Sequence, residues 1–144
     1  MYEEIGQVSE ATISQLRTIL SESTWEEHIS DVTDHQAAPC NVQVQAVDEI
    51  VVRWPVDTWH QLLLLRLKPG GKLYRHADEG YGFHIPVETN RRAVCSTYEN
   101  DFAVDQNLQV GKIYRVDRSI EHEAFNNGRT DRTHLIVILK GDSL

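Results

Sequence analysis

Apolar and polar residues alternate with a period of two over much of the chain from Trp59 onward. Side chains of a β-strand point alternately to the two faces of a sheet, so this pattern predicts strands. Turn signals such as Asn127-Gly128 separate the runs, which is typical of sandwiches and barrels. The predicted strands span residues 59–68, 72–77, 82–87, 92–98, 102–104, 112–116, 123–126 and 134–139. We therefore expect a mainly β protein, a double-stranded β-helix (jelly roll) of about eight strands.

The first of these predicted strands is apolar at consecutive positions from Leu62 to Leu65. A strand with one solvated face would alternate instead, so the run indicates burial on both faces. The run is far too short to span a bilayer, and we expect no membrane association.

The beginning of the chain has a helical pattern instead. An apolar stripe at helical spacing, preceded by Ser9 as a cap, predicts a helix over residues 9–20. Ser23 and Glu26 have the spacing of a capping box, which predicts a second, short helical turn.

The next residues are predicted to connect this helical part to the sheet. Residues 30–41 are polar and are expected to form a connector, with His28 and His35 solvated on the surface. From Val42 onward the period changes from helical to two, with Val42, Val44 and Ala46 alternating with polar residues, and residues 49–54 are expected to form a short strand. We therefore expect one domain over residues 1–144, with an N-terminal helical extension over 1–41 and a jelly-roll core over 42–144.

Charge and cysteine content narrow the classes of function. The net charge of −8 weighs against nucleic-acid binding, which needs a basic face. The acidic N-terminus lacks the apolar core of a secretory signal. Cys40 and Cys95 are too few for a disulfide framework, and a reducing cytoplasmic location is expected.

Three residues have the chemistry and spacing of a metal site. His76 and Asp78 lie two apart where a predicted strand ends, so both side chains should point to one face at a rim. His122 opens a later strand, which a jelly roll can bring beside the first. Two imidazoles and a carboxylate on one side of a metal leave positions free, as in non-haem Fe(II) oxygenases. Taken singly, each of the three residues could be an ordinary surface or turn residue.

Arg132 follows His122 by ten residues and precedes a strongly apolar strand. A guanidinium can bind a carboxylate through two hydrogen bonds and stays charged, so Arg132 is a candidate anchor for a dicarboxylic co-substrate. A salt bridge to Asp131 is the alternative. His134 should face the same side as Arg132, where it would support the anchor or be a hydrogen-bonded core histidine. His84 could hold the co-substrate or lie in the core.

The sequence VDRSIEHEAFNNGRTDRTHLIVIL, with HIPVET before it, resembles the aspartyl/asparaginyl β-hydroxylase family of Fe(II)- and 2-oxoglutarate-dependent dioxygenases. The resemblance covers about half of the chain, residues 69–139. It implies that His76 and His122 bind iron, that Arg132 binds 2-oxoglutarate and that His84 helps to hold it. Animal members of the family lack a carboxylate ligand two residues after the first histidine, whereas this chain has Asp78, as in the wider superfamily.

The resemblance also implies a cupin-like dioxygenase that uses Fe(II), 2-oxoglutarate and O2 and releases succinate and CO2. Its substrate would be an aspartyl or asparaginyl residue, a peptide or a free amino-acid-like molecule. Aromatic side chains are candidates for the pocket walls, with a role in the core or at the rim as the alternative: Tyr74, which could contact the co-substrate, and Tyr81, Phe83 and Tyr114.

Two other functions stay open at this point. The run GKIYRVDRSIEHEAFN approximates the second cupin motif, with Gly111, His122 and Asn126 at matching offsets. A cupin-like metal-binding protein that does not use 2-oxoglutarate is therefore the first alternative. Asp117 and Ser119 replace its usual Pro and Gly, which favours the dioxygenase. The second alternative is a non-catalytic jelly-roll binding module.

Overall fold

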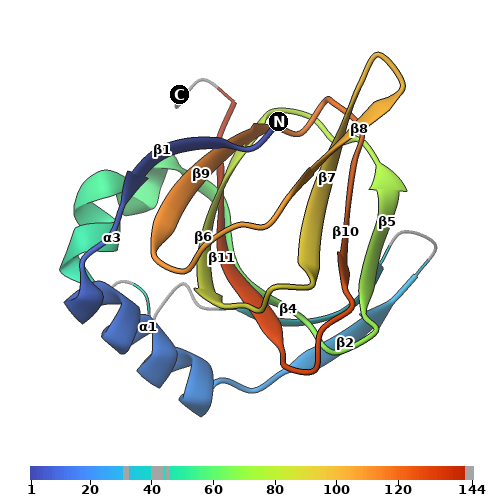
Figure 1. Cartoon of the computed structure of the whole chain (residues 1–144). Coiled ribbons are helices and arrows are strands. Elements are labelled where there is room, and N and C mark those ends of the chain that lie inside the picture. The colour runs from blue at the N-terminus through green and yellow to red at the C-terminus, as the bar shows by residue number, and fades with distance from the viewer. Residues whose placement is uncertain (31–32, 40–43, 45, 142–144) are drawn as a thin grey trace.

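The computed structural model describes residues 1–30, 33–39, 44 and 46–141. Within these residues the strands form one antiparallel sheet in the order β1-β9-β6-β11-β4-β3-β5-β10-β7-β8, and β2 pairs with β3. The sheet curls so that β5, β10 and β7 face β9, β6, β11 and β4 across an interior (Figure 1). The expected mainly β jelly roll is confirmed.

The elements in chain order are β1 (Glu3–Gln7), α1 (Glu10–Glu22), β2 (Glu26–Ile29), β3 (Thr33–Pro39), α3 (Asp48–Arg53), a 3-10 turn (Val56–Thr58), β4 (Trp59–Leu67), β5 (Lys72–His76), β6 (Tyr81–Glu88), β7 (Ala93–Glu99), β8 (Phe102–Gln106), β9 (Lys112–Asp117), β10 (His122–Asn126) and β11 (Arg132–Leu139).

Strands β4 to β11 correspond to the eight strands predicted from Trp59 onward. The consecutive apolar residues of β4 divide between two environments. Leu62 and Leu64 are 2% and 0% exposed and belong to the hydrophobic core, whereas Leu63 and Leu65 line an interior cavity. The predicted burial on both faces of β4 is therefore only partly correct: one face packs under the helices, whereas Leu63 and Leu65 on the other face are half-buried at the cavity.

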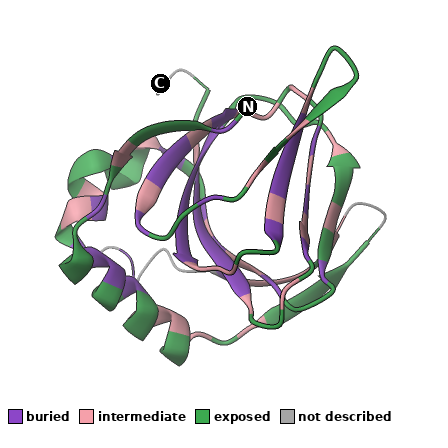
Figure 2. Ribbon diagram, viewed as in Figure 1, coloured by how far each residue is buried: buried purple, intermediate pink, exposed green. Residues whose placement is uncertain are grey.

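Helices α1 and α3 lie on one side of the molecule, outside the curled sheet (Figure 1). Ile13 and Leu16 of α1 and Ile50 of α3 share a core cluster with Leu135 of β11. The buried parts of the ribbon are concentrated in the strands, while α1 keeps an exposed side (Figure 2). The Ser9 hydroxyl accepts a hydrogen bond from the N–H of Thr12 at 3.1 Å, so Ser9 is the predicted cap. Among the described helices, none is long and apolar enough to cross a membrane.

The predictions for the N-terminal part were largely wrong outside α1. Strand β1 was not predicted, and Glu26 begins β2 where a second helical turn was expected. The N–H of Ser23 instead donates to the carbonyl of Leu20, so Ser23 ends α1. Residues 33–39 form β3, which pairs with β4 and β5, where a connector was expected. Strand β2 is exposed and β3 is mostly half-buried, so the polar residues of this segment belong to a hairpin at the edge of the cavity rather than to a loop.

Residues 48–53 form a helix, so the short strand predicted over residues 49–54 was also wrong. Val47, Ile50 and Trp54 are all buried, at the spacing of one helix face, and this packing outweighs the apparent alternation. Val42 and Cys40 lie outside the described residues. Cys95 is buried and has a free thiol.

Candidate metal centre and its pocket

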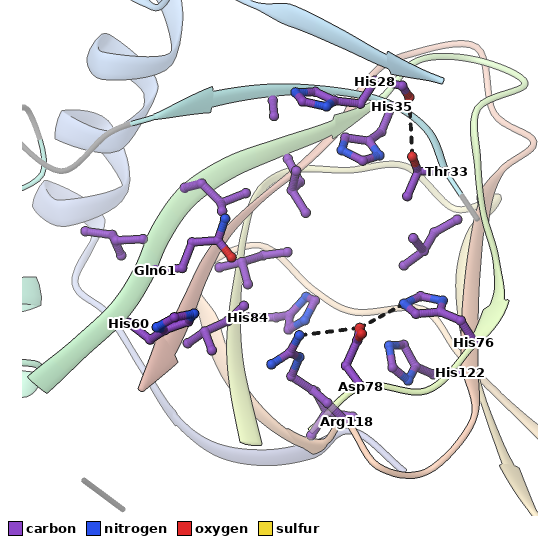
Figure 3. Close-up of a pocket in the computed structure, with 18 of the residues that line it drawn as sticks. His28, Thr33, His35, His60, Gln61, His76, Asp78, His84, Arg118 and His122 are labelled. Carbon is purple, nitrogen blue, oxygen red and sulfur yellow. Dashed lines mark hydrogen bonds and ion pairs between the residues drawn. The ribbon is translucent and has the colours of Figure 1, made fainter. Parts of the chain in front are cut away.

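His76, Asp78 and His122 converge at one end of the interior cavity (Figure 3). His76 ends β5 and His122 begins β10, and the antiparallel pairing places the two residues opposite each other. The ligand atoms of the three residues all lie within 4.8 Å of one another. His76 Nε2 is 3.2 Å from Asp78 Oδ2, and the two imidazole centroids are 4.4 Å apart. Side chains from two strands and the loop after β5 thus form a cluster that could hold a metal ion.

Both imidazoles are oriented by main-chain carbonyls. His76 Nδ1 lies 2.6 Å from the carbonyl oxygen of Tyr74, and His122 Nδ1 lies 2.8 Å from that of Ile120. A carbonyl only accepts, so each Nδ1 carries a proton and Nε2 is the ring nitrogen left for a metal. Burial lowers the pKa of His122, which favours the neutral ligand form. Histidines that bind metals commonly have their second ring nitrogen fixed in this way.

Arg118 holds the loop that carries Asp78. The carbonyl of Arg118 accepts from the N–H of Asp78 at 2.8 Å, and its N–H donates to the carbonyl of Gly80 at 2.9 Å. Gly80 has a φ of +83°, a conformation that side chains disfavour. The guanidinium of Arg118 lies 3.4 Å from Asp78 Oδ2. The sequence analysis missed Arg118, because an arginine in a polar turn carries no signal that separates it from a surface residue.

The cavity has a volume of about 600 Å³, which is the size range of small-molecule sites. Residues far apart in the sequence meet in it, and six of the seven histidines of the chain line it: His28, His35, His60, His76, His84 and His122. Figure 3 shows the β2–β3 hairpin and the start of β4 across the open space from the metal cluster. The cavity therefore has a polar rim on the side away from the cluster.

His28 and His35 were expected to be solvated surface residues, which is confirmed for His28 and wrong for His35. They are paired across the hairpin, and their rings stack with centroids 5.2 Å apart and planes 13° apart. His28 is exposed, but His35 is half-buried. Burial and the neighbouring His28 lower the pKa of His35. The strand pairing that turns both rings toward the cavity could not be read from a segment interpreted as a connector.

Arg132 lies at the start of β11 and is 5% exposed. Its Nη2 donates to Cys95 Sγ at 3.5 Å, and among the described residues it forms no ion pair. Asp131, the alternative partner considered above, pairs instead with Arg66 at 3.5 Å. A buried cation without a counter-ion is costly, so the surroundings of Arg132 favour binding of an anion.

His84 and His134 form a second pair of imidazoles, buried beside Arg132. Their Nδ1 atoms are 3.0 Å apart. Burial, reinforced by the charge of Arg132, holds the pKa of both rings well below the ordinary value, so both are neutral. One Nδ1 must then donate and the other accept, which gives the two rings opposite tautomers. His84 also lines the cavity, whereas His134 is a hydrogen-bonded core residue.

The aromatic residues considered for the pocket walls lie elsewhere. Tyr74 is 45% exposed and borders a separate depression on the outer surface, so it does not contact the cavity. A register shift between β5 and β10 breaks the alternation that would have placed Tyr74 beside His76. Phe83 packs against Trp54 in the core under the helices. Tyr114 is buried in a second apolar cluster, and Tyr81 is 38% exposed.

Comparison with known families gives one match that covers nearly the whole chain. A family model described as Aspartyl/Asparaginyl beta-hydroxylase matches residues 4–140. A search of curated proteins finds no match.

Solved structures with a similar fold share little sequence with this chain. One is an oxidoreductase of the 2OG-Fe(II) oxygenase family from Burkholderia pseudomallei, with a TM-score of 0.76 at 9% identity over 92% of this chain and 80% of that chain. Another is a prolyl-4-hydroxylase from Pseudomonas putida, with a TM-score of 0.66 at 12% identity over 97% and 92%. A predicted oxalate decarboxylase from Thermotoga maritima has a TM-score of 0.55 at 21% identity over 83% and 94%. At these identities the likeness concerns the fold.

Proposed function

Because the chain belongs to the aspartyl/asparaginyl β-hydroxylase family and is thus an oxygenase, we propose that it is an Fe(II)- and 2-oxoglutarate-dependent dioxygenase. The substrate we propose is an aspartyl or asparaginyl residue, a peptide or a free amino-acid-like molecule. The observation that carries the proposal is the convergence of His76, Asp78 and His122 on one end of a cavity. His84 of the same cavity pairs with His134 beside Arg132, a buried arginine that forms no ion pair among the described residues.

The donor set fits iron(II). Two imidazoles and one carboxylate on a single side are the facial triad of non-haem iron oxygenases, and both imidazoles have the tautomer that a metal needs. Iron(II) held by these residues would supply O2 activation, coupled to oxidative decarboxylation of 2-oxoglutarate to succinate and CO2. Arg118 would keep Asp78 at the cluster, and the walls of the cavity would limit access of water.

Arg132 and His84 are the residues that we assign to 2-oxoglutarate. The Arg132 guanidinium would pair with the carboxylate that is distal to the metal. His84 would donate a hydrogen bond from Nε2 to the co-substrate, because its Nδ1 accepts from His134 in the tautomer that leaves the proton on Nε2. His134 would then act through His84, as a positioning residue. Tyr74 has no place in this arrangement, because it lies on the outer surface.

The prime substrate would occupy the wider part of the cavity, between the metal cluster and the β2–β3 hairpin. His28, His35 and His60 border this region, and Arg118 provides a cation next to the cluster. A polar wall with several hydrogen-bonding side chains suits a polar substrate better than an apolar one.

Turnover without a prime substrate provides the first test. Purified protein with Fe(II), ascorbate and 2-oxoglutarate should form succinate, if only slowly, and each component left out should stop it. Tight iron binding without 2-oxoglutarate binding would contradict the proposal and favour a cupin-like metal protein. Absence of both binding events would favour a non-catalytic binding module.

A further inference from the structure

The two edges of the curled sheet meet at Tyr2. Strand β1 stands at one end of the strand order and β8 at the other. The N–H of Tyr2 donates to Gln106 Oε1 at 2.8 Å, and Gln106 Nε2 donates to the carbonyl of Tyr2 at 2.9 Å. Gln106 is the last residue of β8, so a single side-chain amide joins the two edges. This reciprocal pair fixes the backbone of Tyr2 and hence the direction of its side chain.

The phenol ring of Tyr2 points into the interior. The residue is 3% exposed, and its ring meets the His84 ring edge-on, with centroids 5.2 Å apart and planes 85° apart. Tyr2 also lines the cavity that contains the metal cluster. It therefore links the open cavity to the buried surroundings of Arg132.

Two strong hydrogen-bond donors lie beside one weak acceptor here. Arg132 Nη2 is 3.5 Å from Cys95 Sγ, and the phenol of Tyr2 lies beside the same thiol. Burial, with the neighbouring thiol, raises the pKa of Tyr2, so its hydroxyl keeps the proton that it can donate. A thiol sulfur is a poor acceptor, whereas a carboxylate accepts from both kinds of donor with short, charge-assisted bonds.

We propose that the Tyr2 hydroxyl donates a hydrogen bond to the distal carboxylate of 2-oxoglutarate, beside the ion pair with Arg132. The inference rests on the proposed function and adds a co-substrate contact from the N-terminal strand. The sequence around Tyr2 does not predict a contact with the co-substrate, because β1 is a mostly exposed edge strand. The role follows from the edge closure that brings Tyr2 to Cys95 and His84.

The test is a comparison of two 2-oxo acids on iron-loaded protein without oxygen, by titration calorimetry. 2-Oxoglutarate carries the distal carboxylate and 2-oxopentanoate lacks it. Wild-type protein should prefer 2-oxoglutarate strongly. Tyr2→Phe should weaken 2-oxoglutarate binding by about tenfold or more, as expected for one hydrogen bond to a charged group, and should leave 2-oxopentanoate binding almost unchanged.

Tyr98→Phe is the matched control, because it removes a hydroxyl that donates to Glu123 and does not line the cavity. It should leave the affinity for both acids unchanged. If Tyr2→Phe weakens both acids equally, or neither, Tyr2 does not contact the distal carboxylate and the inference is overturned. If the wild-type protein does not prefer 2-oxoglutarate, the proposed function itself fails. Melting temperatures of both variants separate a lost contact from a loosened fold.

Discussion

Two pairs of imidazoles are held in different ways: His76, His122 and His84 line the cavity, and His134 is buried beside His84. In the pair His76–His122, each Nδ1 faces a main-chain carbonyl, at 2.6 and 2.8 Å. In the pair His84–His134, the Nδ1 atoms face each other at 3.0 Å. Asp78 lies beside the first pair and Arg132 beside the second.

The hydrogen-bond partner of Nδ1 determines whether Nε2 of the same ring can donate a proton or offer a lone pair. A carbonyl fixes a proton on Nδ1, so both Nε2 atoms of the first pair offer lone pairs to a cation. A shared proton between two rings makes one Nε2 a donor, and burial, reinforced by the nearby guanidinium, keeps both rings neutral. The same side chain thus suits a metal in the first pair and, in the function that we propose, an anionic co-substrate beside the second.

The largest effect is expected from removal of a ring in the first pair. His122→Ala should abolish stoichiometric iron binding while the fold persists, because the remaining histidine and Asp78 cannot form the facial set. Iron content and circular dichroism check this. His60→Ala removes an exposed imidazole from the same cavity and should leave iron content unchanged. Retained iron stoichiometry in His122→Ala would contradict the ligand assignment.

Arg132→Leu should affect the binding of 2-oxoglutarate and the binding of iron differently. Loss of the buried cation should weaken 2-oxoglutarate binding about 100-fold and change iron affinity little. Anaerobic calorimetry with each ligand measures both effects. Arg115→Leu, on an exposed part of β9, is the control and should bind both ligands normally. Unchanged affinity for 2-oxoglutarate in Arg132→Leu would mean that Arg132 is only structural.

His134→Phe should have a smaller effect, because in the arrangement that we propose His134 acts through His84. Loss of the Nδ1 partner leaves the tautomer of His84 free, and 2-oxoglutarate should bind about tenfold more weakly, with iron affinity preserved. Nitrogen chemical shifts of His84 report its tautomer directly. His134→Asn, which keeps a polar group near the Nδ1 position, should restore part of the affinity. A loss of affinity with no change in the His84 tautomer would count against this route.

Acidification should gradually lower the free energy of unfolding, because of the buried pair His84 and His134. The pKa values of His84 and His134 are lowered by burial, so below the ordinary histidine pKa of about 6.5 the unfolded chain binds more protons than the native one. Stability should therefore be full above this pH and should fall as the pH drops, by about 1.4 kcal/mol per pH unit for each such group. Urea unfolding of the metal-free protein at several pH values measures this slope. His134→Phe should have a shallower slope than the wild type, and an equal slope would contradict the prediction.

Period-two alternation and turn residues were enough to predict the strands from Trp59 onward, because each is short and clearly bounded. The same reasoning failed upstream. Strand β2 has no buried residue and is held by pairing with β3, which is a tertiary contact. The helix at Ile50 depends on packing under the sheet, which outweighs local preference.

The metal cluster could be predicted because two of its residues are neighbours in sequence and metal ligands belong to few residue types. The role of Arg132 as an anion site, inferred from the chemistry of a guanidinium and from the family resemblance, stays a prediction. Tyr2 and Arg118 could not be predicted. The position of Tyr2 depends on the contact between the two sheet edges, and that of Arg118 on hydrogen bonds between two turns. Neither feature produces a periodic pattern in the sequence.

Successive residues of β11 divide between two layers: Leu135 and Val137 lie in the core under the helices, and His134 and Ile136 face the inside of the curled sheet. A slip of this strand by one residue would exchange the two sets. The apolar layer under α1 and α3 consequently determines which side chains reach the cavity. Substitutions in that layer, far from any ligand, are therefore able to inactivate the protein by misaligning a strand that is still fully paired.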